Sequence, residues 1–198
     1  MQIPFYFDYS CPWAYLGSCR VESYFRELGA EIDFRPVHLA SLVEKGAGKR
    51  PELGARKKAH YGADLRRWAE MIGAEFSPDA RSLYRSDTRL ALRAALVAKD
   101  EGRFRGFHYP AYRARWADAQ DLSQEDAVRG LLEGAGLEAD RALERAHSDE
   151  MVQRLERDTQ EAIDRGVFGV PTLFAGGEMF WGNDRFELVR YYIQKAGS

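Results

Sequence analysis

The segment that decides the fold spans residues 3–37 and reads IPFYFDYSCPWAYLGSCRVESYFRELGAEIDFRPV. Its first six residues, 3–8, form an uninterrupted and mostly apolar run that predicts a short strand. Over residues 12–28, apolar side chains recur every three or four positions, which predicts a helix that Gly29 ends. Residues 32–37 alternate between apolar and polar side chains and predict a second strand. A strand, a helix and a strand in so short a segment indicate a parallel βαβ unit.

The middle of the chain has a different pattern. Residues 46–54 are rich in glycine and charged side chains and predict a loop, and from there to about Arg165 the pattern is helical. Within this stretch, Ser123 with Asp126 resembles a capping box, and Ser148 predicts the start of a further helix. The middle is therefore predicted to be a large, all-helical insertion.

Strand patterns return after Gly166. Residues 171–175 and 178–181 are separated by two glycines, which predicts a hairpin. Asp184 with Glu187 predicts the start of a final helix. The order is therefore βαβ, a helical insertion, then ββα, which predicts an α/β fold.

The composition is that of an ordinary globular protein. The 198 residues are 45% apolar and 30% charged, which excludes a disordered chain, a collagen and a disulfide-stapled miniprotein. Lysine and arginine number 29 against 31 acidic residues, and a net charge of -2 argues against a dedicated nucleic-acid binder. No apolar run reaches the roughly 18 residues that span a membrane. The chain starts without the pattern of a secretory signal and has two cysteines, so we expect a cytoplasmic location.

The tetrapeptide Cys11-Pro12-Trp13-Ala14 carries the most chemical information. A cysteine between a strand and the first turn of a helix faces free backbone N–H groups and the positive end of the helix dipole. This environment lowers the pKa of a thiol from about 8.5 and favours a nucleophilic thiolate. The alternative is a small apolar side chain at a helix start. Cys19 lies about 12 Å further along the predicted helix, too far for a disulfide, and we predict a thiol packed in the core.

Val170-Pro171 is the second informative motif. A proline between a helix end and a hairpin is a candidate for a cis peptide bond, with a rigid trans turn as the alternative. If the two halves share one sheet, Val170 would expose its backbone beside Cys11. That backbone could then pair with an extended, peptide-like ligand.

Other side-chain groups carry less information. Four scattered histidines support no metal site, and an aromatic band is typical of a core between helices or of a pocket for an aromatic substrate. The aromatic band consists of Phe104, Phe107, Tyr109, Tyr112 and Trp116. Residues 45–67 hold eight basic side chains, which form either a solvated face or a field that attracts anionic substrates.

The order of elements, with Cys11-Pro12 at a helix start and Val170-Pro171 before a hairpin, resembles the thioredoxin fold with a DsbA-type helical insertion. Residues 8–17, DYSCPWAYLG, are similar to the opening of the 2-hydroxychromene-2-carboxylate isomerases and kappa-class glutathione transferases. Residues 166–172 and 180–185 are similar to the end of these proteins, and residues 34–39 to their second strand.

The resemblance implies two domains and a glutathione site. Residues 1–45 and 166–198 would form the thioredoxin-like domain, and residues 46–165 the helical insertion domain. Cys11 would contact the glutathione sulfur, and the backbone at Pro12 and Trp13 would help to hold it.

The remaining contacts to glutathione follow from the same resemblance. Val170, before Pro171, would pair through its main chain with the cysteinyl part of glutathione. Asn183 and Asp184 would hold the γ-glutamyl end, where helix N–H groups suit a carboxylate and the acid suits an amine; the alternative is a plain helix cap. Lys49 falls near the position of the family's asparagine and would bind the glycyl carboxylate.

The resemblance also implies a reaction. Glutathione would act as a thiol cofactor that adds to an unsaturated aromatic keto acid, allows rotation about a bond and leaves again. The family usually has serine at the position of Cys11, and dithiol oxidoreductases have a second cysteine at the position of Ala14. A monothiol DsbA-like thiol-disulfide oxidoreductase that uses Cys11 is therefore the alternative. A non-catalytic binding module is a third possibility. Family members are commonly homodimers, so we expect a homodimer.

Overall fold

One mixed sheet is built from both ends of the chain. The computed structural model describes residues 1–47 and 54–196, and every structural statement refers to these residues. The strands are β1 (Gln2–Phe7), β2 (Glu31–Pro36), β3 (Thr172–Ala175) and β4 (Glu178–Trp181), in the order β2-β1-β3-β4. β1 pairs in parallel with β2 and antiparallel with β3, and β3 pairs antiparallel with β4. The predicted βαβ unit and hairpin are confirmed, and they share one sheet.

Two helices follow directly from the strands. α1 (Pro12–Phe25) leaves β1 and continues into a short 3₁₀ helix, Arg26–Leu28, which ends at Gly29 in the left-handed region, at φ +61°. α9 (Phe186–Ala196) follows the hairpin. These elements confirm the predicted α/β fold class at both ends of the chain.

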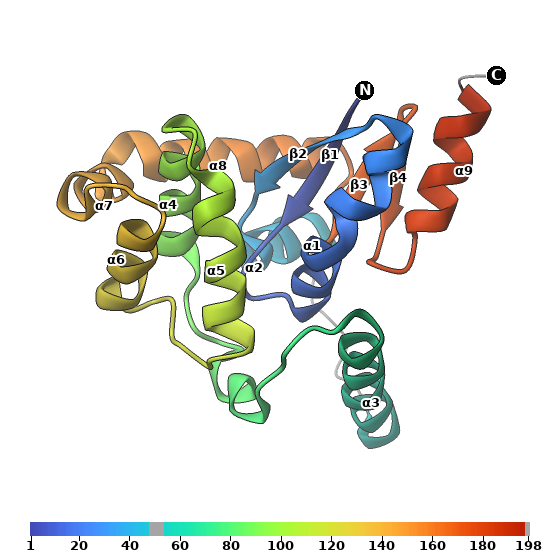
Figure 1. Ribbon diagram of the computed structural model, residues 1–198, viewed down its shortest axis with the longest axis horizontal. Coiled ribbons are helices and arrows are strands. Elements are labelled where there is room, and N and C mark those ends of the chain that lie inside the picture. The colour runs from blue at the N-terminus through green and yellow to red at the C-terminus, as the bar shows by residue number, and fades with distance from the viewer. Residues whose placement is uncertain (48–53, 197–198) are drawn as a thin grey trace.

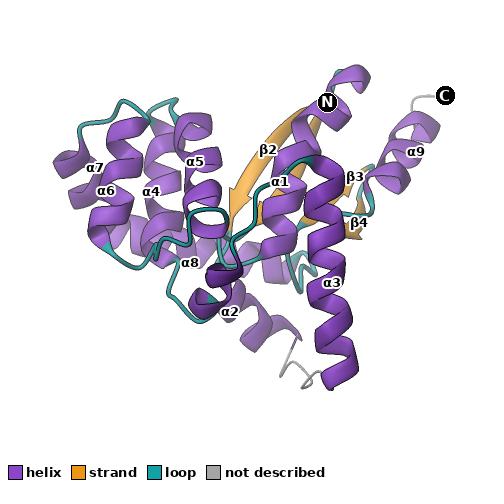
Figure 2. Ribbon diagram, turned by 60° about the horizontal axis from the view of Figure 1, so that its bottom comes forward, coloured by secondary structure: helices purple, strands orange, loops and turns teal. Residues whose placement is uncertain are grey.

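The middle of the chain is helical, as predicted. Its helices are α2 (Leu39–Leu42), a π-helical turn (Val43–Ala47), α3 (Ala55–Ile72), a 3₁₀ helix (Pro78–Leu83), α4 (Arg89–Asp100), α5 (Phe104–Trp116), α6 (Glu125–Gly134), α7 (Ala139–His147) and α8 (Asp149–Asp164). Figures 1 and 2 show α4 to α7 gathered at one side of the sheet, whereas α3 lies apart from them and beside α1. None of the described helices is both long and apolar enough to cross a membrane.

The helix starts test the predicted caps. The hydroxyl of Ser148 accepts a hydrogen bond from the backbone N–H of Met151, so this predicted start of α8 is confirmed. The capping box at Ser123 is wrong, because α6 begins after Gln124 and no side chain caps it. Ser123 instead belongs to the preceding turn, where its backbone N–H donates to Asp121. Of the predicted loop 46–54, residues 46 and 47 end the π-helical turn, and residues 48–53 lie outside the described part.

The core joins the sheet to the helices. Phe5, Phe7 and Phe34 are buried on the sheet, and Phe107, Tyr112 and Trp116 of the predicted aromatic band are buried beside them, as expected for a core. The prediction that Cys19 is a core thiol is wrong, because its side chain is exposed. The buried positions of α1 include residues 14–18, 21 and 25, so the helical rotation turns position 19 away from the packed face.

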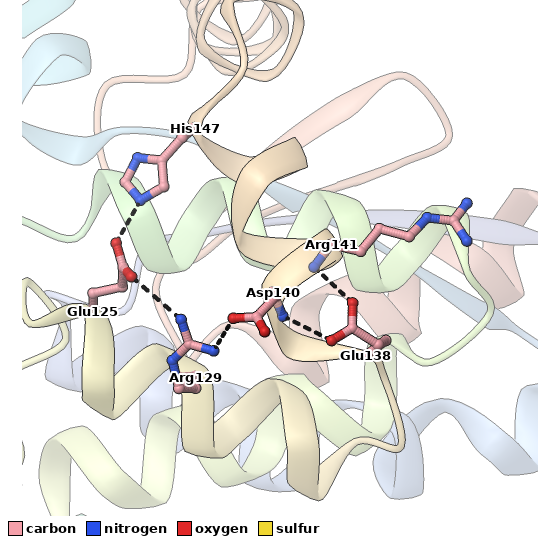
Figure 3. Close-up of polar contacts among 6 residues, drawn as sticks. All are labelled: Glu125, Arg129, Glu138, Asp140, Arg141 and His147. Atoms are coloured by element: carbon pink, nitrogen blue, oxygen red, sulfur yellow. Dashed lines mark hydrogen bonds and ion pairs between the residues drawn. The ribbon is translucent and has the colours of Figure 1, made fainter.

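A set of polar side chains on α6 and α7 forms ion pairs and a helix cap at the surface. In Figure 3, Arg129 of α6 lies between Glu125 and Asp140, and Glu125 also pairs with His147. Glu138 caps α7 by accepting hydrogen bonds from the backbone N–H groups of residues 140 and 141. These pairs are largely exposed, and exposed ion pairs contribute little to stability. Among the described residues, no group of three or more acidic, histidine or cysteine side chains is placed to hold a metal.

Candidate functional site

Cys11 stands at the N-terminal end of α1. β1 ends at Phe7, and a tight turn follows in which the backbone N–H of Cys11 donates to the carbonyl oxygen of Asp8 at 3.0 Å. Cys11 has extended backbone angles and occupies the N-cap position, and Pro12 is the first residue of the helix. A proline at this position does not destabilise the helix, because the N–H that proline lacks would have no partner in the helix. The side chain of Cys11 is only 7% exposed.

The two proline motifs meet in space, as predicted. The thiol of Cys11 donates a hydrogen bond to the carbonyl oxygen of Val170, with 3.1 Å between Sγ and O. The peptide bond between Val170 and Pro171 is cis. The backbone N–H of Gly182 donates to the carbonyl oxygen of Pro171 at 2.9 Å, so the end of β4 also lies beside the cis peptide bond. The sheet therefore joins the start of α1 to the segment that leads into α9.

A cavity of about 250 Å³ lies beside this junction. Its lining comes from α1, α3 and the C-terminal segment: Trp13, Asp64, Trp68, Val170, Pro171, Trp181, Gly182, Asn183, Asp184 and Arg185. Asn183 is 3% exposed, and its Nδ2 has no hydrogen-bond partner among the described residues. A buried amide without a partner costs free energy. This donor is therefore available to a molecule that occupies the cavity.

Gly182 positions the carboxylate of Asp184. Gly182 has φ +120°, a conformation that side-chain-bearing residues rarely adopt. A Cβ at Gly182 would lie 2.5 Å from Oδ1 of Asp184, so the carboxylate folds back over the glycine. Arg185 also donates to Asp184 at 2.9 Å. Because α9 begins at Phe186, Asp184 lies two residues before the helix, at the rim of the cavity.

Asp8 fixes the turn that holds Cys11. Its carboxylate is fully buried and accepts three hydrogen bonds: from the backbone N–H of Ser10 at 2.8 Å, that of Leu39 at 2.7 Å and the hydroxyl of Thr88 at 2.7 Å. Leu39 begins α2, and Thr88 is the N-cap of α4. One carboxylate thus ties the Cys11 turn to α2 and to α4 of the helical middle.

A buried histidine lies behind the site. His108 of α5 is fully buried, and its two ring nitrogens lie 3.2 Å from the hydroxyls of Tyr9 and Ser18. Its ring stacks on that of Phe104 at 4.7 Å. Burial holds the pKa of His108 well below its ordinary value, and the charge of Arg105 lowers it further. His108 is therefore a neutral part of the core.

The structure brings most of the predicted site residues together. Trp13, Val170, Pro171, Asn183 and Asp184 line the cavity. Cys11 contacts its wall at Val170, and the buried Pro12 starts the helix above it. Lys49 lies outside the described residues.

The side of the cavity that α3 forms was not predicted from the sequence. Asp64 and Trp68 are four residues apart and share one face of this helix. Trp181, at the end of β4, was also missed. Their spacing is the only sequence signal that places Asp64 and Trp68 on one helix face. It does not indicate which element that face packs against.

Comparisons with known proteins agree with this geometry. Residues 2–194 match the family model described as a DSBA-like thioredoxin domain. The chain is 31% identical to a 2-hydroxychromene-2-carboxylate isomerase of Sphingobium xenophagum, over 96% of this chain and 97% of that protein. It is 22% identical to human glutathione S-transferase kappa 1, over 96% and 90%. A solved structure of a 2-hydroxychromene-2-carboxylate isomerase superposes with a TM-score of 0.87 at 26% identity, covering 100% of this chain and 96% of that one.

Proposed function

We propose, from the premise that the chain belongs to the family of DSBA-like thioredoxin domains, that it is a glutathione-dependent isomerase of the 2-hydroxychromene-2-carboxylate isomerase type. The observation that carries this proposal is the buried amide nitrogen of Asn183, which lies in the wall of a cavity beside Cys11 and has no hydrogen-bond partner in the described part of the chain. The names of the relatives support the type of reaction, and the name of the kappa transferase supports the thiol. The substrate proposed is an unsaturated aromatic keto acid.

The donor set of the cavity fits glutathione. Nδ2 of Asn183 offers a buried hydrogen-bond donor to a carboxylate, and the carboxylate of Asp184 offers an acceptor to an amine. Val170 offers backbone groups to a peptide, and Trp13 offers an apolar wall. Lys49, proposed for the glycyl carboxylate, lies outside the described residues.

Each group has a distinct task in the reaction. When bound, glutathione would supply a thiolate for reversible addition to the unsaturated carbon, with the electron pair of the double bond held by the conjugated carbonyl until the thiolate departs. Cys11 would serve as a hydrogen-bond donor to this sulfur by turning its single S–H proton away from the carbonyl oxygen of Val170. The N-terminal end of α1 favours negative charge at the same place. The cavity residues hold the tripeptide so that its sulfur meets the second substrate in a fixed orientation.

Asp184→Ala tests the glutathione site. We expect the variant to bind reduced glutathione at least about tenfold more weakly, because a hydrogen bond to a charged group contributes about 1.5–3 kcal/mol and 1.4 kcal/mol is a factor of ten. Calorimetric titration of the fully reduced protein measures the change. Glu187→Ala is the matched control, because it removes an exposed carboxylate of α9 that does not line the cavity. Wild-type affinity in Asp184→Ala would show that the site is wrongly assigned.

Cys11→Ser separates the isomerase from the alternative oxidoreductase. A serine hydroxyl is the better hydrogen-bond donor, so the variant should retain or increase the rate of isomerisation of 2-hydroxychromene-2-carboxylate in the presence of glutathione. A monothiol oxidoreductase would instead lose its reduction of hydroxyethyl disulfide, because a hydroxyl cannot form the mixed disulfide. Cys19→Ser removes the exposed thiol outside the site and should behave as wild type in both assays. Loss of isomerisation in Cys11→Ser alone would contradict the donor role.

A further inference from the structure

Two arginines from separate segments converge on one turn of α3. A Cβ placed on Gly62 would lie 2.5 Å from Nη2 of Arg81 and 4.0 Å from Nη1 of Arg66, so both guanidinium groups approach this glycine. Gly62 is buried, whereas both arginine side chains are exposed. Neither arginine forms an ion pair with an acidic side chain among the described residues. Two neighbouring cations without a counter-ion favour the binding of an anion between them.

This pair borders the approach to Cys11. Tyr61 precedes Gly62, and its ring packs edge-on against that of Trp13, with 5.5 Å between the centroids. Trp13 is the second residue after Cys11 and covers the start of α1. The turn of α3 that carries Gly62, and that Arg81 approaches from the 3₁₀ helix, is thus in direct contact with the segment that carries the thiol.

Tyr84 follows the 3₁₀ helix that carries Arg81. Its ring packs on Trp116, with 5.6 Å between the centroids, and the side chain is 38% exposed. Burial raises the pKa of Tyr84, the charge of Arg81 lowers it, and the charge of Cys11 raises it again. The backbone N–H of Tyr84 donates to the carbonyl oxygen of Arg81 at 3.3 Å, and Trp116, on which the ring packs, donates to the carbonyl oxygen of Tyr9, two residues before Cys11.

A buried arginine fixes the segment that carries Arg81. Arg115 of α5 is 0% exposed, and its Nη1 donates to the carbonyl oxygen of Ala80 at 3.1 Å. Its guanidinium lies over the ring of Trp116, at 4.6 Å from the centroid. Arg81 directly follows Ala80, so this contact holds the backbone of Arg81 in place.

We infer that Arg66 and Arg81 bind the carboxylate of the second, aromatic substrate, and that Tyr84 contacts its aromatic body beside Cys11. None of these three side chains lines the cavity that contains Asn183, so they would form a separate acceptor subsite. The inference rests on the proposed function for the identity of the second substrate. It adds that this substrate is recognised as an anion by two arginines. Both guanidinium groups can approach Gly62 because glycine has no side chain.

A pair of unreactive probes tests the charge recognition. Cinnamate and cinnamamide share a planar, unsaturated aryl body and differ in charge, and quenching of tryptophan fluorescence reports their binding, with and without saturating glutathione. We expect wild type to prefer cinnamate by at least about tenfold, and Arg66→Gln or Arg81→Gln each to remove most of that preference. Gly62→Ala should have a similar effect, because its Cβ displaces Arg81 without removing a charge.

Arg56→Gln is the matched control. It removes the same charge from an exposed position of α3, more than a turn away from Gly62, so it should keep the preference. If Arg56→Gln lost the preference for cinnamate to the same extent, the preference would come from the general positive potential of the basic side chains. That result would overturn the subsite. Equal binding of the two probes by wild type, or a preference that survives in Arg81→Gln, would overturn it as well.

Glutathione binding separates this inference from the proposed function. Arg81→Gln should bind reduced glutathione as wild type does, because Arg81 does not line that cavity. If wild type binds no glutathione, the proposed function fails, while the comparison of cinnamate with cinnamamide still decides the subsite. If glutathione binds but the probes do not differ, only the subsite fails.

Discussion

Asp8→Asn is expected to lower the free energy of unfolding by about 3 kcal/mol. The carboxylate accepts three buried hydrogen bonds, from Ser10, Leu39 and Thr88. The amide of asparagine keeps one acceptor oxygen and turns a donor toward groups that are themselves donors. At least one buried N–H or O–H loses its partner, and hydrogen bonds to charged groups contribute about 1.5–3 kcal/mol each. Urea unfolding at neutral pH measures the loss.

Asp33→Asn is the control for this variant. Asp33 pairs with Lys99 and Arg35 at the edge strand β2, where its side chain is 19% exposed. Water can solvate these partners when the pairs are broken, so the loss should be about 1 kcal/mol or less. Equal losses in the two variants would contradict the structural role of Asp8. The Asp8 variant should also disturb the turn that holds Cys11, because Ser10 loses its acceptor.

The second large effect is a loss of stability in mild acid that depends on His108. In the folded protein, burial keeps the pKa of His108 well below the value of about 6.5 that it has in an unfolded chain. Below about pH 6.5 the unfolded chain therefore binds a proton that the folded protein does not bind. The free energy of unfolding should fall by up to about 1.4 kcal/mol per pH unit, or about 2 kcal/mol between pH 6.5 and pH 5.

Paired variants isolate this histidine. His108→Gln removes the titrating ring, so its free energy of unfolding should change less between pH 6.5 and pH 5 than that of wild type. His60→Gln removes an exposed histidine from α3 and should keep the wild-type slope. Four carboxylates with lowered pKa add their own loss of stability only at lower pH, as they become protonated: Glu22, Asp33, Asp87 and Asp121. Equal slopes in wild type and His108→Gln would contradict the assignment.

The sequence predicted those parts of the fold that depend on local pattern. The alternation in β2, the periodicity of α1 and the two glycines between β3 and β4 are all local, and the structure confirms each element. The contact between Cys11 and Val170 was predictable because the two motifs mark strand ends of one sheet. The homodimer, the cytoplasmic location and the two domain ranges stay predictions.

Other features depend on packing that no local pattern records. Gly62, Arg66 and Arg81 form one group only because α3 lies beside the 3₁₀ helix that contains Arg81. In the sequence, Arg66 is one of eight basic side chains and Gly62 interrupts a helical pattern without an evident reason. The exposure of Cys19 was missed for a related cause, since periodicity defines the apolar face of a helix but not its exact width.

The position of β1 in the sheet has a consequence for biosynthesis. On one edge β1 pairs with β2, which the ribosome makes soon afterwards, but on the other edge Phe5 pairs with Leu173. A nascent chain therefore carries β1 with one open edge until β3 has been made. Unpaired strand edges are sites of association between chains. The sheet that carries Cys11 is therefore completed only after the helices between β2 and β3 have been made, when the hairpin of β3 and β4 emerges.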